Sequence, residues 1–558
     1  MKKYYIFLLL TLFGLIKIEA QQHKSPKLFV GIVVDQMRAE YLNRFYNQFG
    51  EKGFKRLMNE GFNCRNVYYN YIPTYTGPGH ASIYTGTTPS YHGIVANDWY
   101  NRQLKHTVYC VNDTTERMVG IDGGKKSFSP RNLLSTNLGD ELKISTNQNA
   151  KVIGISLKDR AAVLPAGHMA NAAYWLDLKS GNFVSSTFYM KALPDYVKQF
   201  NNEKKADAYI ENIWNLLLPE SSYPLSIDDN NRYENNWVGK QEPVFPYNLK
   251  ELAPQNPPYF EVLYASPFGN SLLTDFAIET IKSEALGKGL YTDFLAISFS
   301  STDAVGHKFG PLSKEVNDTY LRLDRDIARL LNALDQLVGI GNYTLFLTAD
   351  HAMAEVSQYL IDHKVPAGYI NSDELLKEAS LFLKNQFGEN GLIETLVNGQ
   401  FYLNKTLISE KKLDLLGIQN KLAGYLKDQQ GIFQVYTASQ LDEQVFTKNF
   451  STQIQNGFFY KRSGDVAFVL EPGWTDDTNN AATHGTGYTY DTHAPLLWYG
   501  FGISKGESYV HYNITDIAPT VSAILNIKLP SACIGNPMVE IISQHIGQLN
   551  GLVLQVHE

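Results

Sequence analysis

The chain has 558 residues, a formal net charge of −7 at pH 7 and three cysteines. A negative charge of this size disfavours a nucleic-acid-binding surface, so we expect no nucleic-acid partner. Three cysteines are too few for a disulfide scaffold, although Cys64 and Cys110 could form one bridge in an oxidising compartment.

The N-terminus has the pattern of a secretory signal. Lys2 and Lys3 precede the apolar run YYIFLLLTLFGLI, and the sequence IEA follows it. Because this run is too short for a membrane span, the pattern predicts a signal peptide over residues 1–20 that is cleaved after Ala20. Removing its three lysines and one glutamate lowers the formal charge from −7 to −9. We therefore expect an exported, periplasmic protein without a stable membrane anchor, and the sequence is compatible with a monomer.

The first predicted strand ends in a carboxylate. In FVGIVVDQMR, an apolar, β-branched run stops at Asp35. A buried parallel strand delivers such a side chain to the carboxyl edge of its sheet. A single Asp at this position is more often a helix cap or a turn former. Asp35 therefore becomes a candidate functional residue only if other strands further along the chain also end in polar side chains.

A helix is predicted to begin at Thr76, in the segment YIPTYTGPGHASIYTGTTP. Thr76 would be the N-cap, with proline near the first helical position. A hydroxyl at a helix N-terminus lies in the field of free backbone N–H groups, which favours an alkoxide and a bound anion. Thr76 is thus a candidate nucleophile, and a simple cap is the alternative. We expect His80 and His92 to support the site through hydrogen bonds.

Two cations follow the next predicted strand. The run KVIGIS begins at Lys151 and leads into SLKDR. Lys158 and Arg160 are two residues apart and could point the same way. Arg can fork two phosphoryl oxygens while Lys adds a compact charge, an arrangement that suits a phosphate monoester. The alternative is a solvated basic patch that includes Asp159.

Two later strand-like runs end in an Asp that is followed by a His. FLAISFSSTDAVGH contains Asp303 and His307, and TLFLTADH ends in Asp350 and His351. Asp303 and His307 could also be a local pair on one helical turn. Three carboxylates and three imidazoles nevertheless suit two Zn²⁺ ions with three protein ligands each. The candidate ligands are Asp35, Asp303, His307, Asp350, His351 and His493.

Together these motifs resemble the alkaline phosphatase superfamily, most closely the phosphate-irrepressible (PafA-type) bacterial alkaline phosphatases. The resemblance runs from about residue 27 to the C-terminus. The segments that carry it are VVDQMR, PTYTGPGH, NDWY, SLKDR, STDAVGH, LTADH and YDTHAPLLWYG.

The resemblance implies a ligand set and a mechanism. One Zn²⁺ would be held by Asp303, His307 and His493. The other would be held by Asp35, Asp350 and His351, with Thr76 beside it. Asn97, Lys158 and Arg160 would hold the phosphoryl oxygens. Thr76 would attack phosphorus and form a phosphothreonine that water then hydrolyses. We expect His484, in a Gly- and Thr-rich loop, to support the ligands from outside.

These implications favour hydrolysis of small-molecule phosphate monoesters. Two Zn²⁺ and three carboxylates leave about one positive charge, before the two cations are counted, which suits dianionic phosphate. A phosphodiesterase or nucleotide pyrophosphatase of the same superfamily is the first alternative. An exported, metal-stabilised binding protein is the second.

The spread of the motifs predicts one discontinuous core rather than several domains. By resemblance we expect an α/β three-layer sandwich: a largely parallel central sheet with helices on both faces, and two insertions. One core helix should bury a stripe of Val316, Tyr320, Leu323, Ile327, Leu331 and Leu334. The expected boundaries are 1–20 for the signal peptide, 21–167, 266–354 and 481–558 for the core, 168–265 for the first insertion and 355–480 for a cap-like second insertion.

Overall fold

The computed structural model describes residues 25–121 and 127–543. The predicted signal peptide, residues 1–20, lies outside the described residues. Among the residues that are described, no helix is both long and apolar enough to cross a membrane. All three cysteines are free, so the bridge between Cys64 and Cys110 that the sequence allows is not formed.

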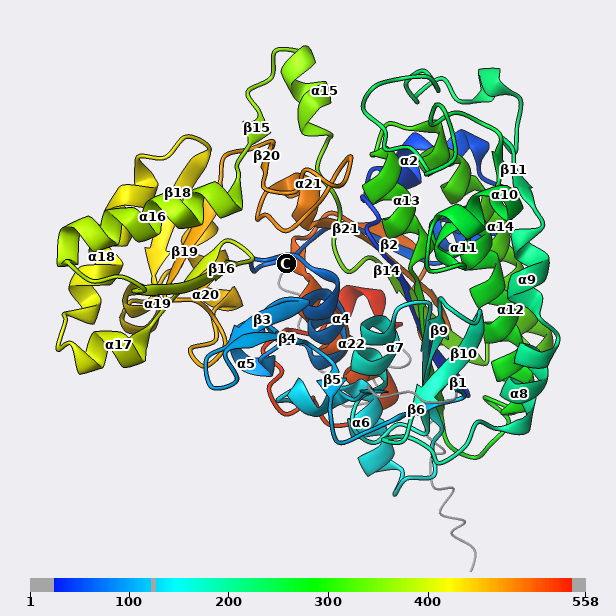
Figure 1. The fold of residues 1–558 in the computed structure, drawn as a ribbon. Helices are drawn as coiled ribbons and strands as arrows, with labels where there is room; N and C mark the ends of the chain where they lie inside the picture. Colours follow the sequence, from blue (N-terminus) through cyan, green and yellow to red (C-terminus); the bar gives the residue numbers. More distant parts are fainter. Residues whose placement is uncertain (1–24, 122–126, 544–558) are drawn as a thin grey trace, which may run out of the picture.

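A central sheet of eleven strands organises the fold (Figure 1). Its middle is parallel: β1 (Leu28–Val34) pairs with β13 (Asp293–Phe299) and with β14 (Tyr343–Thr348), and β13 pairs with β8 (Val152–Ser156). Every residue of these four strands is buried, as expected for a parallel sheet that is covered on both faces. The predicted α/β fold with a largely parallel sheet is confirmed.

The edges of the sheet are mixed. On one side, β21 (His493–Gly500) runs antiparallel between β14 and β2 (Phe62–Tyr68). Two short strands, β22 (Gly506–Ser508) and β23 (Tyr512–Asn513), continue parallel to β2. On the other side follow β9 (Ala172–Asp177), β10 (Asn182–Ser186) and β6 (Met118–Val119).

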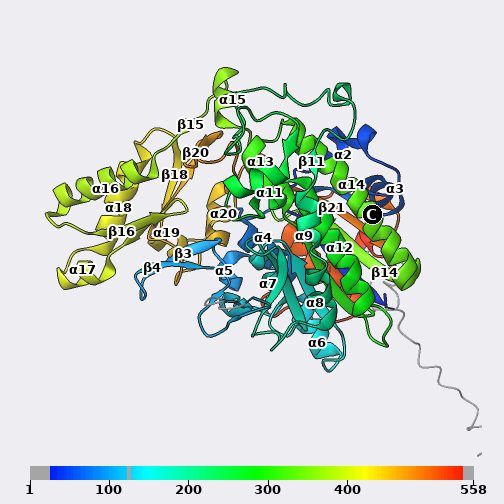
Figure 2. The ribbon, with the colours of Figure 1, turned by 45° about the vertical axis from the view of Figure 1, so that its right-hand side comes forward.

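Helices cover both faces of the sheet. One group contains α12 (Pro267–Ser283), α13 (Ser301–Phe309) and α14 (Lys314–Leu334), which pack on one another. The other group contains α4 (Thr76–Thr85), α6 (Leu138–Ser145), α7 (Asp159–Ala166) and α22 (Ile517–Leu525). Figures 1 and 2 show the sheet between these groups. All six residues of the predicted stripe on α14 are buried, which confirms it as a core helix.

The first predicted insertion begins later than the sequence suggests. The chain does not leave the core at residue 168, because β9 pairs in parallel with β8 and β10 pairs with β9 in the central sheet. Beyond them, α8 (Asp195–Asn202), α9 (Lys205–Ile210) and the pair β11 (Ile213–Trp214) and β12 (Tyr247–Asn248) form a layer over α12 and α14. Trp214 anchors this layer, since its indole N–H donates to Asp318 at 2.7 Å.

Residues 355–480 contain a separate lobe that projects from the core (Figures 1 and 2). Its antiparallel sheet has the order β16 (Ile393–Val397), β17 (Gln400–Leu403), β19 (Val466–Leu470) and β18 (Ile432–Thr437). Helices α16 (Ser372–Phe387) and α18 (Leu415–Lys427) share an apolar core with this sheet. The lobe contacts the NDWY segment of the core through Asn398, whose side chain donates to Asp98 O at 2.8 Å.

Candidate active site

The carboxyl ends of three adjacent parallel strands place the predicted ligands together. Asp35 directly follows β1, Asp350 lies two residues after β14, and Asp303 is on α13, which begins just after β13. These strands are neighbours in the sheet, so their carboxyl ends open at one edge. The convergence expected from the sequence is therefore present in the fold.

Asp35, Asp350 and His351 form one group, which we call the sheet-edge set. Their ligand atoms lie within 4.8 Å of one another. His351 Nε2 is 3.4 Å from Asp35 Oδ1 and 3.6 Å from Asp350 Oδ2, and all three residues are fully buried. Asp35 Oδ1 and Asp350 Oδ2 have no hydrogen-bond partner. Buried carboxylate oxygens without a donor are suited to a cation.

Asp303 and His484 form a second group with His351, their ligand atoms within 4.8 Å of one another, and His307 contacts Asp303; we call Asp303, His307 and His484 the helix-and-loop set. Asp303 Oδ1 is 3.2 Å from His307 Nε2 and 3.8 Å from His484 Nε2. The His484 ring stacks on that of His351, with 3.5 Å between centroids, so the two sets adjoin. His484 comes from the loop before α21 (Thr489–Thr492), whereas its two partners are one turn apart on α13.

The three histidines of these sets share one hydrogen-bond pattern. In each, Nδ1 lies within hydrogen-bond distance of a backbone carbonyl: His307 with Ala482 at 2.8 Å, His351 with Ala352 at 2.9 Å and His484 with Thr74 at 2.7 Å. A carbonyl can only accept, so Nδ1 carries the proton and Nε2 presents a lone pair. This is how metal-binding histidines are oriented. Together with the unpartnered carboxylate oxygens, the donor set fits divalent metal ions.

The structure does not bring His493 to this cluster. His493 is the first residue of β21, and its Nε2 is 3.0 Å from Arg65 O on the adjacent strand β2. Its ring stacks on Tyr68, with 4.6 Å between centroids. The predicted ligand role is therefore corrected: His493 packs on β2, and His484 occupies the place that the sequence assigned to it.

Thr76 lies against the sheet-edge set. It is the first residue of α4, and Tyr75 rather than Thr76 occupies the N-cap position, so the hydroxyl is not used as a cap. Thr76 Oγ1 is 3.5 Å from His351 Nε2 and accepts a hydrogen bond from Arg160 Nη2 at 3.4 Å. The helix can approach this closely only because residue 79 is a glycine, since a Cβ there would lie 2.3 Å from Asp350 O.

Asn97 lies at the N-terminus of α4 beside Thr76. Its side-chain oxygen accepts from Gly77 N at 2.7 Å. This bond satisfies one of the free N–H groups of the helix start and fixes which way the amide faces, so its NH₂ group points away from the helix backbone. Asn97 is therefore close enough to serve the same substrate group as Thr76.

Lys158 is buried and Arg160 is half-buried, and both point into the site instead of forming a solvated patch. Lys158 Nζ donates to Asp35 Oδ2 and to Asp303 Oδ2, both at 2.6 Å, and thus bridges the two ligand sets. Arg160 is oriented by Tyr109, whose hydroxyl accepts from Nη1 at 2.9 Å and donates to Asp159. The two cations expected from SLKDR therefore converge on the predicted centre.

The electrostatics of the centre are those of an anionic pocket. Burial raises the pKa of Asp350 to about 6, and burial with the charges of Asp303 and Asp350 raises the pKa of Asp35. Burial also acts to raise the pKa of Asp303, but the nearby Lys158 ammonium holds it well below its usual range. Burial acts to lower the pKa of Lys158, and the charges of Asp303 and Asp35 raise it overall. One ammonium thus faces three carboxylates, which leaves room for further positive charge.

Two supporting residues complete the site. His80 Nδ1 donates to Thr76 O at 2.9 Å, and its Nε2 accepts from Ser298 Oγ at 2.8 Å, as the sequence led us to expect of a supporting histidine. Gln36 was not predicted. Its amide donates to Asp303 Oδ1 at 2.8 Å, and its backbone N–H donates to Asp350 Oδ1 at 3.2 Å. Gln36 therefore donates one hydrogen bond to a carboxylate of each ligand set.

The backbone of Gln36 explains why it reaches both carboxylates. Its φ is 67°, in the left-handed region that non-glycine residues seldom occupy. Gly306 leaves space for its side chain, because a Cβ there would lie 1.9 Å from Gln36 Oε1. The only signal in the sequence is that Gln36 directly follows a strand-end Asp.

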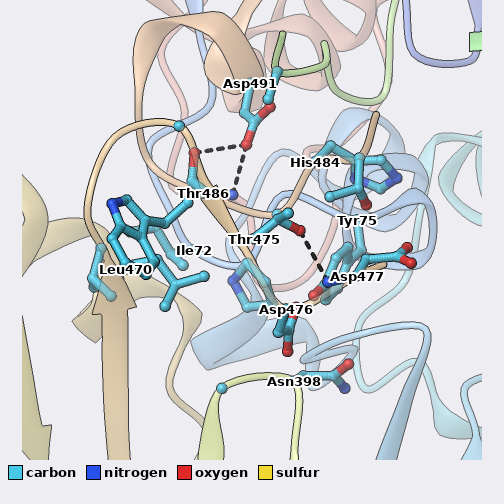
Figure 3. A pocket seen from close by; sticks show the side chains of 18 of the residues that line it. Ile72, Tyr75, Asn398, Leu470, Thr475, Asp476, Asp477, His484, Thr486 and Asp491 are labelled. Carbon is cyan, nitrogen blue, oxygen red and sulfur yellow. Dashed lines mark hydrogen bonds between the residues drawn. The ribbon is translucent and has the colours of Figure 1, made fainter. Parts of the chain in front are cut away.

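A cavity adjoins the centre at His484 (Figure 3). It lies between the core segments around Ile72 and Thr486 and the lobe strand that ends at Leu470. In Figure 3, His484 and Tyr75 form one side of the cavity and Ile72 and Leu470 the other. Two of the lining residues are close to the site in the chain: Tyr75 directly precedes Thr76, and His484 belongs to the helix-and-loop set.

Comparison with known proteins decides the family. Residues 29–494 match the family described as type I phosphodiesterase / nucleotide pyrophosphatase. The chain belongs to this family. It is 42% identical to alkaline phosphatase PafA from Elizabethkingia meningoseptica, over 93% of this chain and 95% of that protein. A crystal structure of wild-type PafA matches with a TM-score of 0.88 and 42% identity, over 93% of this chain and 99% of that one.

Two other relatives share the same percentage of sequence identity with this chain but carry different functional names. Alkaline phosphatase PhoV from Synechococcus elongatus is 42% identical over 93% of each chain. A protein named calcium-transporting ATPase from Myroides odoratus is 42% identical over 95% of this chain and 97% of that protein. The matches to PafA and PhoV make the present chain a hydrolase of the alkaline phosphatase superfamily and favour an enzyme over the binding protein considered above.

Proposed function

We propose that this hydrolase is a zinc-dependent alkaline phosphatase that releases inorganic phosphate from small-molecule monoesters through a phosphothreonine on Thr76. The observation that carries the proposal is the position of the Thr76 hydroxyl, 3.5 Å from His351 Nε2 and 3.4 Å from Arg160 Nη2. A candidate nucleophile, a set of candidate metal ligands and a cation that can bind a phosphoryl oxygen thus lie next to one another.

The metal ligands we propose differ from the first expectation at one position. One Zn²⁺ would be held by Asp303, His307 and His484, and the other by Asp35, Asp350 and His351, with Thr76 beside it. Mixed carboxylate and imidazole ligands favour Zn²⁺ over Mg²⁺, which seldom binds imidazole. When bound, such metal ions would act as Lewis acids toward the phosphoryl oxygens.

The protein side chains carry the remaining steps. Thr76 Oγ1 attacks phosphorus and its proton passes to solvent, the bond from phosphorus to the alcohol oxygen breaks, and the departing alkoxide leaves on the opposite side and takes up a proton from solvent. Water then attacks the phosphothreonine, which restores the hydroxyl and releases phosphate. Arg160, already directed at Thr76 Oγ1 and braced by Tyr109, would hold a non-bridging oxygen through the transfer. Asn97, bound to the same helix start, would donate to another.

Lys158 supports a monoester over a diester as the substrate. Its ammonium lies between Asp35 and Asp303, where an unesterified phosphoryl oxygen would find both a cation and a hydrogen-bond donor. A diester places an ester group at one of these oxygens and loses that interaction. The family description names phosphodiesterases, so diester hydrolysis is the second candidate function and is tested in parallel.

The proposal is tested by trapping the covalent enzyme. Acid-quenched turnover of a ³²P-labelled monoester should leave label on the peptide that contains Thr76. Thr76→Ala should lose this label and about 10³-fold or more in kcat/KM, whereas Thr76→Ser should keep it. Thr85→Ala is a matched control, because Thr85 is also buried in α4 but its hydroxyl bonds to Ala81 O within the helix. Label on another residue would refute the assignment. ATP belongs among the substrates assayed, given the name of the relative from Myroides odoratus.

A further inference from the structure

The cavity beside His484 has an unusual distribution of charge. Asp476, Asp477 and Asp491 line it, and none of them pairs with a cation, while Glu355 also lines it but is bound to Arg38 at 2.8 Å. Among the described residues, no Lys or Arg lines the cavity. Asp476 and Asp477 therefore make its potential negative, in contrast to the cationic groups at the phosphate position, while burial raises the pKa of Asp491 to about 7.

One of these carboxylates is both buried and incompletely bonded. Asp491 is fully buried, and its Oδ2 accepts from the backbone N–H and the hydroxyl of Thr486 at 2.8 and 2.6 Å. Its Oδ1 has no hydrogen-bond partner. A buried carboxylate oxygen on a cavity wall that lacks a donor is costly unless a ligand supplies a positive charge or an N–H group.

The rest of the lining is aromatic and aliphatic. Tyr75, Trp474 and Tyr490 contribute rings, and Ile72 and Leu470 contribute aliphatic surface. Figure 3 shows Asp491 and Asp476 at opposite ends of the lining, with Thr486 and Thr475 between them and Ile72 and Leu470 to one side. Aromatic rings combined with carboxylates bind organic ammonium groups, because the ring faces attract the cation and the apolar walls accept its methyl or methylene groups.

The position of the cavity connects it to the leaving group of the reaction. Thr76 lies beside His351, so in-line attack directs the departing oxygen away from the sheet-edge set and toward the helix-and-loop set. His484 belongs to that second set and also lines the cavity. An alcohol extending beyond the departing oxygen can therefore enter the cavity past His484.

Resting on the function proposed above, we infer that this cavity is a leaving-group subsite for phosphate monoesters of amino alcohols, including quaternary ones. The ammonium group would lie among Tyr75, Trp474 and Tyr490, in the field of the Asp476 and Asp491 carboxylates at the two ends of the cavity. The enzyme should consequently prefer a cationic leaving group to a neutral one of the same shape.

The test compares phosphocholine with 3,3-dimethylbutyl phosphate, which replaces the quaternary nitrogen by carbon. In the native, zinc-loaded enzyme, kcat/KM should be about ten-fold higher for phosphocholine. Asp476→Asn removes one carboxylate while keeping an oxygen that can accept from Ser372, and it should reduce this ratio about three-fold. Asp373→Asn is the matched control, because Asp373 is an exposed acid on the same lobe that does not line the cavity, and it should keep the native ratio.

The possible outcomes separate the two proposals. Equal kcat/KM for both esters, or a ratio that Asp476→Asn and Asp373→Asn change alike, would overturn the subsite while leaving the phosphatase proposal intact. Failure to hydrolyse either ester would overturn the phosphatase proposal itself, and the subsite with it.

Discussion

The two ligand sets reach the same point by different routes. Asp35, Asp350 and His351 follow strands β1 and β14, so the register of the central sheet determines where they lie. In the helix-and-loop set, Asp303 and His307 are held by α13, but His484 depends on a loop that returns from the lobe. A sheet edge fixes its ligands through backbone pairing, whereas a loop ligand depends on individual side-chain contacts. The two sets should therefore differ in how they respond to perturbation.

Removing metal should have the largest effect, because it disables both sets at once. We expect exhaustive chelation to abolish monoester hydrolysis, and Zn²⁺ to restore it better than Mg²⁺. The measurement is activity against metal content in a preparation analysed by atomic emission. Full activity at a metal content near zero would rule out the two-zinc proposal.

His484→Ala should cause the next largest loss of activity and should act on the helix-and-loop set alone. We expect about a 10³-fold loss of kcat/KM and a metal content lower by about one ion, because three protein ligands fall to two. His493→Ala is the matched control, since that imidazole bonds to Arg65 O and packs on Tyr68 outside the cluster. It should change kcat/KM by less than about three-fold. The opposite result, with His493→Ala the more damaging, would restore the first ligand assignment.

Lys158→Ala and Arg160→Ala should distinguish the substrate classes. Each should lower monoester hydrolysis by about 10²–10³-fold, because each removes a charge-assisted hydrogen bond to the phosphoryl group. Diester hydrolysis should fall much less, since a diester lacks the extra anionic oxygen. A phenyl phosphate and its methyl diester provide the comparison within each variant. Equal losses for both esters, or a native enzyme that prefers the diester, would favour the phosphodiesterase.

Gln36→Gly should have the smallest effect and should act on the helix-and-loop set, since the backbone N–H that donates to Asp350 is kept. Glycine accepts the φ of 67° without strain, so the substitution removes the amide bond to Asp303 and keeps the backbone conformation. We expect about a ten-fold loss of zinc affinity, as for other groups that orient a ligand from behind. A zinc titration monitored by activity measures this. Unchanged affinity would show that the backbone N–H to Asp350 is the only contribution of Gln36.

The same contrast explains what the sequence could predict. Asp35 and Asp350 were predictable because each ends an apolar run, and a parallel sheet must place such residues at one edge. Thr76, Lys158 and Arg160 were recognised from motifs and lie together in the fold. The stripe on α14 followed from helical periodicity alone. Regular elements thus account for most of the site.

The errors arose where no periodic pattern exists. His484 sits beside Gly485, whose φ of 128° allows the loop to pass the Tyr75 ring, and a one-dimensional pattern does not show such a contact. His493 does lie at this edge of the sheet, because the antiparallel strand β21 begins where β14 ends, but its side chain bonds to Arg65 O and stacks on Tyr68 instead of joining the cluster. The boundary at residue 168 failed because the sheet continues through β9, a short strand that the sequence did not separate from the insertion.

The position of β21 also sets an order of events for a newly made chain. This strand, from near the C-terminal end, lies between β2 and β14, which are made much earlier. Until it emerges, β2 has no partner among the described strands through which to join the rest of the central sheet. Pairings of such long sequence separation are slow to form, because a large loop must close first. A chain that stops short of β21 should therefore remain inactive.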